Sequence, residues 1–137
     1  MLARVIAGLF AITIAGACYK GNSPPASGDG IVLTGDQKAD AAQILDAENQ
    51  AKRLVRTDGC NSISECRSVE VGAKGCGGPR YYLVYCARTT DTTALFRKLA
   101  EIARADHEYN TKYHILSTCE FRLPPTVALS AGACRAQ

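Results

Sequence analysis

The feature that most constrains this chain is a pair of short runs suited to β-strands that flank a glycine-rich loop. Residues 67–71 (RSVEV) alternate polar with apolar side chains, and residues 81–85 (YYLVY) contain no polar aliphatic or charged member. The connecting loop, residues 72–80 (GAKGCGGPR), holds four glycines and a proline, which favour tight turning of the backbone. These runs predict an antiparallel hairpin at the centre of a small domain.

Cysteines stand at both outer ends of this hairpin. If Val71 pairs with Tyr81, Cys66 lies directly opposite Cys86. Opposed cysteines form a disulfide only where the pair is not hydrogen-bonded through the backbone and the Cβ atoms are suitably spaced. The register therefore suggests a Cys66–Cys86 bond, which a slip of one residue would remove.

Six of the seven cysteines fall in the part of the chain that we expect to fold. Their spacing contains no C-x-x-C motif and no closely spaced pairs of zinc ligands, so we expect structural disulfides and neither a metal nor a cofactor. The connectivity stays open, and a bond across Pro124-Pro125 is a second pairing that the sequence favours, between Cys119 and Cys134. The six are Cys60, Cys66, Cys76, Cys86, Cys119 and Cys134.

Residues 1–17 have the form of a signal peptide. A short, positively charged start is followed by an apolar run over residues 5–14 and then by three small residues. The run is too short to cross a bilayer as a helix, which takes about 20 apolar residues. This segment therefore predicts export and not a membrane-spanning anchor.

Residues 14–18 (IAGAC) resemble the lipobox of bacterial lipoproteins, although Ala15 stands where that family usually has a large aliphatic residue. The resemblance implies that Cys18 is lipidated, becomes the mature N-terminus and ties the protein to a membrane. Tyr19 replaces the Asp that commonly retains such proteins in the inner membrane, which implies the outer membrane of a Gram-negative bacterium. The alternative is cleavage after Ala17, which releases a soluble protein that begins at Cys18.

Two observations favour lipidation over simple secretion. Assigning Cys18 to lipid leaves an even number of cysteines, which can close completely. Residues 19–30 are polar and contain Gly, Pro and Ser, as in a flexible linker. We therefore expect a lipidated cysteine and tether over residues 18–33, and a disulfide-stabilised domain over residues 34–137 that faces the periplasm or the cell surface.

The remaining elements point to an α+β fold. Thr34 and Gln37 have the spacing of a capping box, and a helix is expected over residues 36–57, with a second from Thr92 to about Asn110. Short strands are expected at residues 113–116 and 119–123, and an edge strand at residues 126–129. The expected architecture is a small antiparallel sheet centred on the disulfide-pinned hairpin, with two amphipathic helices packed on it.

The sequence contains no catalytic motif, so we assign no catalytic residue. His107 and His114 have no accompanying nucleophile or metal-binding pattern and are interpreted as surface residues. Glu65, Glu70 and Glu120 are candidates for a carboxylate pair, but no spacing brings two of them together. The net charge of +3 is scattered along the chain, which argues against nucleic-acid binding.

The glycine-rich loop is the best candidate for recognition of a partner. A glycine-rich backbone held at Cys76 would present charged and aromatic side chains, which are frequent in interfaces. In the alternative interpretation, the glycines only permit a tight turn and the tyrosines pack against the domain. The candidate binding residues are Lys74, Gly77, Gly78, Arg80 and Tyr81.

The stretch from Cys60 to Cys134 carries a family resemblance. It combines a Cys-x5-Cys spacing, Cys-Gly-Gly-Pro at residues 76–79, Tyr82-Leu83-x-Tyr85, and Ser-Thr-Cys at residues 117–119. In these features it resembles a family of small cysteine-rich exported bacterial lipoproteins of unknown function. Cys86 departs from that family, which has a small residue there, and this argues against a Cys66–Cys86 bond. The resemblance implies a location and no reaction.

Together these features predict an outer-membrane or periplasmic lipoprotein that works as a non-enzymatic binding or structural module. Its expected partners are the membrane, through the lipid on Cys18, and a protein or cell-wall component of the envelope. The alternative function is a periplasmic hydrolase that acts on envelope polymers through carboxylates or His107.

Overall fold

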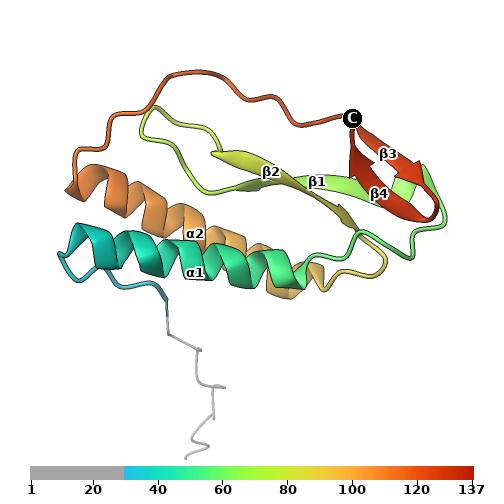
Figure 1. The fold of residues 1–137 in the computed structure, drawn as a ribbon, viewed down its shortest axis with the longest axis horizontal. Coiled ribbons are helices and arrows are strands. Elements are labelled where there is room, and N and C mark those ends of the chain that lie inside the picture. Colours follow the sequence, from blue (N-terminus) through green and yellow to red (C-terminus); the bar gives the residue numbers. More distant parts are fainter. Residues whose placement is uncertain (1–29) are drawn as a thin grey trace, which may run out of the picture.

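The computed structural model describes residues 30–137, and the expected signal peptide, Cys18 and most of the tether lie outside the described residues. The fold is α+β, as predicted, with two helices and two small antiparallel sheets (Figure 1). Within residues 30–137, no helix combines the length and the apolar character that a membrane crossing requires. In chain order the elements are α1 (Gln37–Leu54), the short 3-10 helix η1 (Ile63–Glu65), β1 (Cys66–Val71), β2 (Tyr81–Cys86), α2 (Thr92–Lys112), β3 (Val127–Ser130) and β4 (Ala133–Ala136).

Strands β1 and β2 form the predicted hairpin in the predicted register. Val71 pairs with Tyr81, and Cys66 stands opposite Cys86. The Cys86 N–H donates to the Arg56 carbonyl at 2.7 Å, outside the hairpin. The open end of the hairpin is therefore joined to the segment that follows α1.

The helices lie side by side along one face of this hairpin, and the main core fills the space between the two layers (Figure 1). Ala47, Ala51 and Ala105 are buried where α1 and α2 meet, and their small size lets the helices approach closely. Larger side chains from both layers complete the core. They are Ile44, Val71, Tyr85, Leu95, Leu99 and Ile102.

The packed structure includes the last residues of the expected tether. Ile31 is buried in the main core. Its N–H donates to Glu101 and its carbonyl accepts from Arg104, both at 3.0 Å. Both partners lie on α2, so the segment before α1 is fixed against the second helix and is part of the domain.

The start of α1 differs from the predicted capping box. Asp36 is the N-cap, because its carboxylate accepts the Ala39 N–H at 2.8 Å. Thr34 lies two residues earlier, where its hydroxyl donates to the fully buried Asp40 at 2.8 Å. The acidic side chain next to the helix therefore takes the capping position that the sequence assigned to threonine.

Asp40 joins the start of α1 to the end of α2, at one end of the helical layer (Figure 1). Its carboxylate accepts the Thr34 N–H at 2.7 Å, the Gly35 N–H at 3.2 Å and the Tyr113 hydroxyl at 2.6 Å. Burial alone would raise the pKa of Asp40, but these hydrogen bonds outweigh burial and hold the pKa well below its usual value. Burial and the hydrogen bond to Asp40 raise the pKa of Tyr113 to about 12.

We therefore expect Asp40 to make the domain acid-sensitive. Because the pKa of Asp40 is lower in the folded chain than its ordinary value of 3.8, its stabilising effect is complete above that value. The effect is lost as the pH falls further, since the folded state resists protonation. Urea unfolding at a series of pH values should show Asp40→Asn losing less stability on acidification than the wild type does. Asp46→Asn, at an exposed site of α1, is the control that should follow the wild type; parallel curves for all three proteins would contradict the assignment.

Residues 115–126, named here the strap, do not form the strands predicted at 113–116 and 119–123. Helix α2 runs on to Lys112, and His114 then adopts a left-handed conformation with φ 50° that turns the chain away. The strap crosses the hairpin on the face opposite the helices (Figure 1). The alternating apolar residues of the strap are typical of a β-strand, but the strap forms no backbone hydrogen-bond ladder with β2. The expected last edge strand is confirmed as β3, and it pairs with β4, which was not predicted.

All six cysteines of the domain are paired, but neither favoured pairing is correct. The disulfides are Cys60–Cys86, Cys66–Cys134 and Cys76–Cys119, so Cys66–Cys86 and Cys119–Cys134 are wrong. Although Cys66 and Cys86 are opposed in the hairpin, each bonds to a cysteine from outside it. Several disulfides in so small a chain indicate an oxidising, exported environment.

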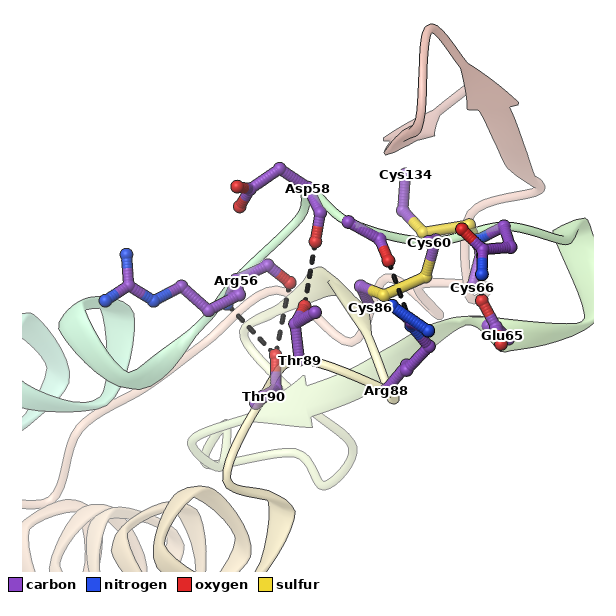
Figure 2. Close-up of a disulfide and its surroundings, with 12 residues drawn as sticks. Arg56, Asp58, Cys60, Glu65, Cys66, Cys86, Arg88, Thr89, Thr90 and Cys134 are labelled. Carbon is purple, nitrogen blue, oxygen red and sulfur yellow. Dashed lines mark hydrogen bonds between the residues drawn. A yellow bond between two sulfur atoms is a disulfide. The ribbon is translucent and has the colours of Figure 1, made fainter.

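Hydrogen bonds after α1 explain this connectivity (Figure 2). The Thr90 hydroxyl donates to the Arg56 carbonyl at 3.1 Å and accepts the Arg56 N–H at 3.0 Å, which aligns residues 56–60 with the turn after β2. The Cys134 N–H donates to the Thr57 carbonyl at 2.7 Å and thereby docks β4 on the same segment. The sulfurs of Cys60, Cys86 and Cys134 consequently lie within 4.8 Å of one another, in two neighbouring disulfides and not as free thiolates.

Candidate functional site

An ion cluster with two buried carboxylates lies under the glycine-rich loop. Arg80 Nε is 2.9 Å from an Asp106 carboxylate oxygen, and its Nη2 forms a second ion pair with Glu48. The Tyr81 hydroxyl donates to the other Glu48 oxygen at 2.8 Å. Glu48 belongs to α1 and Asp106 to α2, so Arg80 joins the two helices at the point where the loop enters β2.

The electrostatics of this cluster favour a structural role. Burial raises the pKa of Asp106, while the Ala73 N–H and Arg80 oppose that rise. Burial also opposes the charged form of Arg80, but its contacts with Glu48 and Asp106 prevail and raise its pKa. Burial and the Glu48 carboxylate raise the pKa of Tyr81. Each group is engaged by another, so the cluster offers no unpaired acid or base for catalysis.

Two of the predicted binding residues belong to this cluster. Arg80 and Tyr81 point toward the helices, and the Tyr81 ring also lies 5.4 Å beneath the Lys52 ammonium group. The loop entry is just as closely packed, because a Cβ on Gly72 would lie 2.3 Å from an Asp106 oxygen. Gly72 also has φ 69°, so a larger residue there would be strained.

The tip of the loop faces solvent. Lys74 accepts the Gly77 N–H through its carbonyl and donates its own N–H to the Gly78 carbonyl, both at 2.9 Å. Gly77 and Gly78 have φ angles of 92° and 74°, and no described atom beyond the adjacent residues lies within 4 Å of where their Cβ atoms would be. These two candidate residues thus form an exposed, tightly closed turn.

Contacts between this loop and the strap hold the two together. The Cys76–Cys119 disulfide joins them covalently, and the Cys76 N–H donates to Ser117 Oγ at 3.0 Å. The Lys74 ammonium group donates to the Glu120 carbonyl. Lys74 is therefore held against the strap and does not extend into solvent as a free contact.

The strap presents an unusual amount of apolar surface. Leu116, Phe121 and Leu123 are 97%, 80% and 73% exposed. A groove of about 500 Å³ runs between the strap and the hairpin, with Tyr82 on one side and Phe121, Leu123 and Pro125 on the other. Charged Glu120 and Arg122 flank Phe121. Large exposed apolar side chains that alternate with charged ones are typical of a surface that binds another protein.

The other candidate residues are all at the surface. His107 lies exposed on α2, and His114 occupies the turn that ends this helix. Glu70 and Glu120 are exposed on β1 and the strap. Glu65 instead accepts the Asn61 N–H at 2.7 Å, which shapes the loop before β1. Neither histidine lines a groove described for residues 30–137.

Sequence reasoning missed Glu48 and Asp106 as partners of the loop. The signal was present, because Asp106 follows Leu95, Leu99 and Ile102 on the apolar side of α2, and Glu48 lies between Ala47 and Ala51. A carboxylate in an apolar stripe calls for a buried cationic partner. Comparisons of the chain with protein-family models, with curated proteins and with solved structures found no match.

Proposed function

We propose that this chain is a lipid-anchored, non-enzymatic protein of the Gram-negative envelope that binds a protein partner through its strap. The partner surface consists of Leu116, Phe121 and Leu123 with the exposed turn at Gly77 and Gly78. In this proposal Cys18 carries the lipid, in the outer membrane, and the tether lets the domain reach its partner.

The observation that carries this proposal is the exposure of three large apolar side chains on one segment of eight residues. Leaving them in water forgoes about 1.5–3 kcal/mol each relative to full burial. The segment is also held in place by a disulfide and by hydrogen bonds, which reduces the entropy lost when a partner docks. A protein partner fits this surface better than a polar cell-wall glycan, because its three most exposed large side chains are apolar.

Site-specific photo-crosslinking in living cells tests the proposal. A photoreactive residue at position 121 or 123 should give one discrete crosslinked protein, and Phe121→Ser with Leu123→Ser should reduce affinity for that purified protein by about tenfold or more. Val32→Ser with Leu45→Ser is the matched control, because it removes exposed apolar surface elsewhere and should leave affinity unchanged.

Two results would count against the proposal. Equal loss of affinity in both double variants would show that general apolar character matters and that the strap is not the site. Retention of the domain on isolated cell-wall sacculi, with no protein crosslink at the strap, would favour a cell-wall partner.

A further inference from the structure

We infer that the Cys76–Cys119 disulfide is a site of thiol–disulfide exchange, which accepts electrons from a dithiol of the envelope and releases the strap. The other two disulfides are structural and do not take part. This inference goes beyond the proposed partner surface and does not depend on it, because exchange is a property of the isolated protein.

The three disulfides differ sharply in their access to solvent. Cys76 and Cys119 are both exposed. The four cysteines of the other two bonds are at most 4% exposed and lie in their own core cluster with Val84, Val127 and Leu129. A thiolate must reach a sulfur atom to attack it, so exchange is confined to the exposed bond.

The surroundings of the exposed bond also assign the attacked sulfur. Cys76 Sγ lies 3.2 Å from the Ser117 carbonyl on the strap side. On its other side the chain continues into Gly77 and Gly78, around which the described structure leaves open space. We therefore assign the attack of the incoming thiolate to Cys76, because the two residues that follow it are exposed and carry no side chain.

Cys119 is then the leaving group, and Lys74 is placed to assist its departure. The Lys74 ammonium group contacts the Glu120 carbonyl, one residue beyond Cys119. Positive charge next to a cysteine favours its thiolate form, and a thiol that forms a thiolate readily leaves faster. Lys74 thus acts as a positioning and electrostatic residue for the exchange.

The reaction balances in two steps. The first thiolate of the dithiol attacks Cys76 Sγ, a mixed disulfide forms, and the electron pair of the broken bond leaves on Cys119 Sγ. The second thiolate of the dithiol then attacks the first sulfur of the dithiol, which is bonded to Cys76 in the mixed disulfide. This releases Cys76 as a thiolate. The dithiol is oxidised by two electrons, the protein disulfide is reduced by two, and both cysteines take up protons from solvent.

Opening of this bond has a defined structural consequence. From Leu116 to Pro124, no side chain of the strap is buried. Once the bond is open, this stretch is held by a few exposed hydrogen bonds, from Lys74, from the Cys76 N–H and from the Tyr82 hydroxyl to the Arg122 carbonyl. Such contacts contribute little in water, so the strap becomes mobile while the helices, the hairpin and the β3–β4 sheet stay folded.

Timed reduction of the folded, oxidised protein tests the inference. The protein is incubated with dithiothreitol, free thiols are trapped with N-ethylmaleimide, and the labelled peptides are quantified by mass spectrometry. We expect Cys76 and Cys119 to be labelled at least about tenfold faster than the other four cysteines, with no loss of helical circular dichroism. Simultaneous labelling of all six, or earlier labelling of Cys60 or Cys66, would overturn the inference.

A monothiol probe separates the roles of the two sulfurs. With glutathione in place of dithiothreitol, the trapped mixed disulfide should be on Cys76, and Lys74→Ala should slow its formation several-fold while Lys74→Arg retains the rate. Glutathione found mainly on Cys119 would reverse the assignment of attacked and leaving sulfurs. Equal rates in Lys74→Ala, Lys74→Arg and the wild type would remove Lys74 from the mechanism.

Discussion

Replacing Cys66 and Cys134 together with alanine is expected to lower the free energy of unfolding by about 3–4 kcal/mol. The bond joins residues 68 apart in the chain and ties β4 to β1, so it restricts a long loop of the unfolded chain. Both cysteines are buried, at 2% and 3% exposed, and the shortened side chains also leave a small cavity. The loss corresponds to a fall in Tm of roughly 12–30 °C, measurable by circular dichroism.

The matched control removes the exposed bond in the same way. Cys76→Ala with Cys119→Ala opens a link between residues 43 apart, so the unfolded chain gains nearly as much freedom. The strap, however, gains freedom in the folded state as well, because none of its side chains from Leu116 to Pro124 is buried. The two gains partly cancel, so this variant should lose about 1–2 kcal/mol. Equal losses in the two double variants would contradict the distinction between structural and labile disulfides.

The hairpin shows which part of the fold is available from the sequence. Alternation over residues 67–71, the aromatic run over residues 81–85 and the glycines between them are local signals, and together they identify both strands and the correct register. The two helices follow from local signals of the same kind. Elements of this sort are predictable because their hydrophobic period and turn residues lie within a few residues of one another.

The disulfide connectivity depends on contacts that such signals do not contain. Cys60 reaches Cys86 because Thr90 aligns the segment after α1, and Cys134 arrives with a β-strand that turns at Gly132. The predicted register correctly placed Cys66 opposite Cys86. The disulfide predicted from that position is nevertheless wrong, because each of the two cysteines bonds to another one. Sequence spacing says which residues are neighbours in a strand, whereas a disulfide also needs the placement of loops from elsewhere in the chain.

The side chains of the glycine-rich loop show the same dependence on the fold for their function. Lys74, Arg80 and Tyr81 have the composition of a binding surface, but each is engaged within the protein, by Glu120, by the helical carboxylates and by Glu48. Their role is to fix the loop, so that the exposed turn and the strap are displayed rigidly. Composition indicates that a residue type suits an interface, and only the fold decides whether the side chain points outward.

Arg80→Met is expected to lower the free energy of unfolding by about 2–4 kcal/mol, because it leaves the carboxylates of Glu48 and Asp106 buried without a cation. Methionine retains most of the aliphatic stem, so the loss reports mainly on the charge. The upper end of the range for a wholly buried pair does not apply, since the Arg80 side chain is 34% exposed and partly screened by water. Arg53→Met, at an exposed site of α1, is the matched control and should change stability by less than about 0.5 kcal/mol.

The pH dependence of this variant separates lost charge pairing from lost packing. Burial already raises the pKa of Asp106 above its ordinary value of 3.8, and Arg80 opposes that rise, so removing Arg80 raises the pKa further. A carboxyl group whose pKa is higher in the folded chain than in the unfolded chain binds a proton more tightly when folded. Protonation of Asp106 therefore stabilises the folded state increasingly as the pH falls toward 3.8. This stabilisation is absent above the raised pKa. Urea unfolding should show the gap between Arg80→Met and the wild type narrowing on mild acidification, whereas a gap independent of pH would mean that Arg80 stabilises the loop by packing alone.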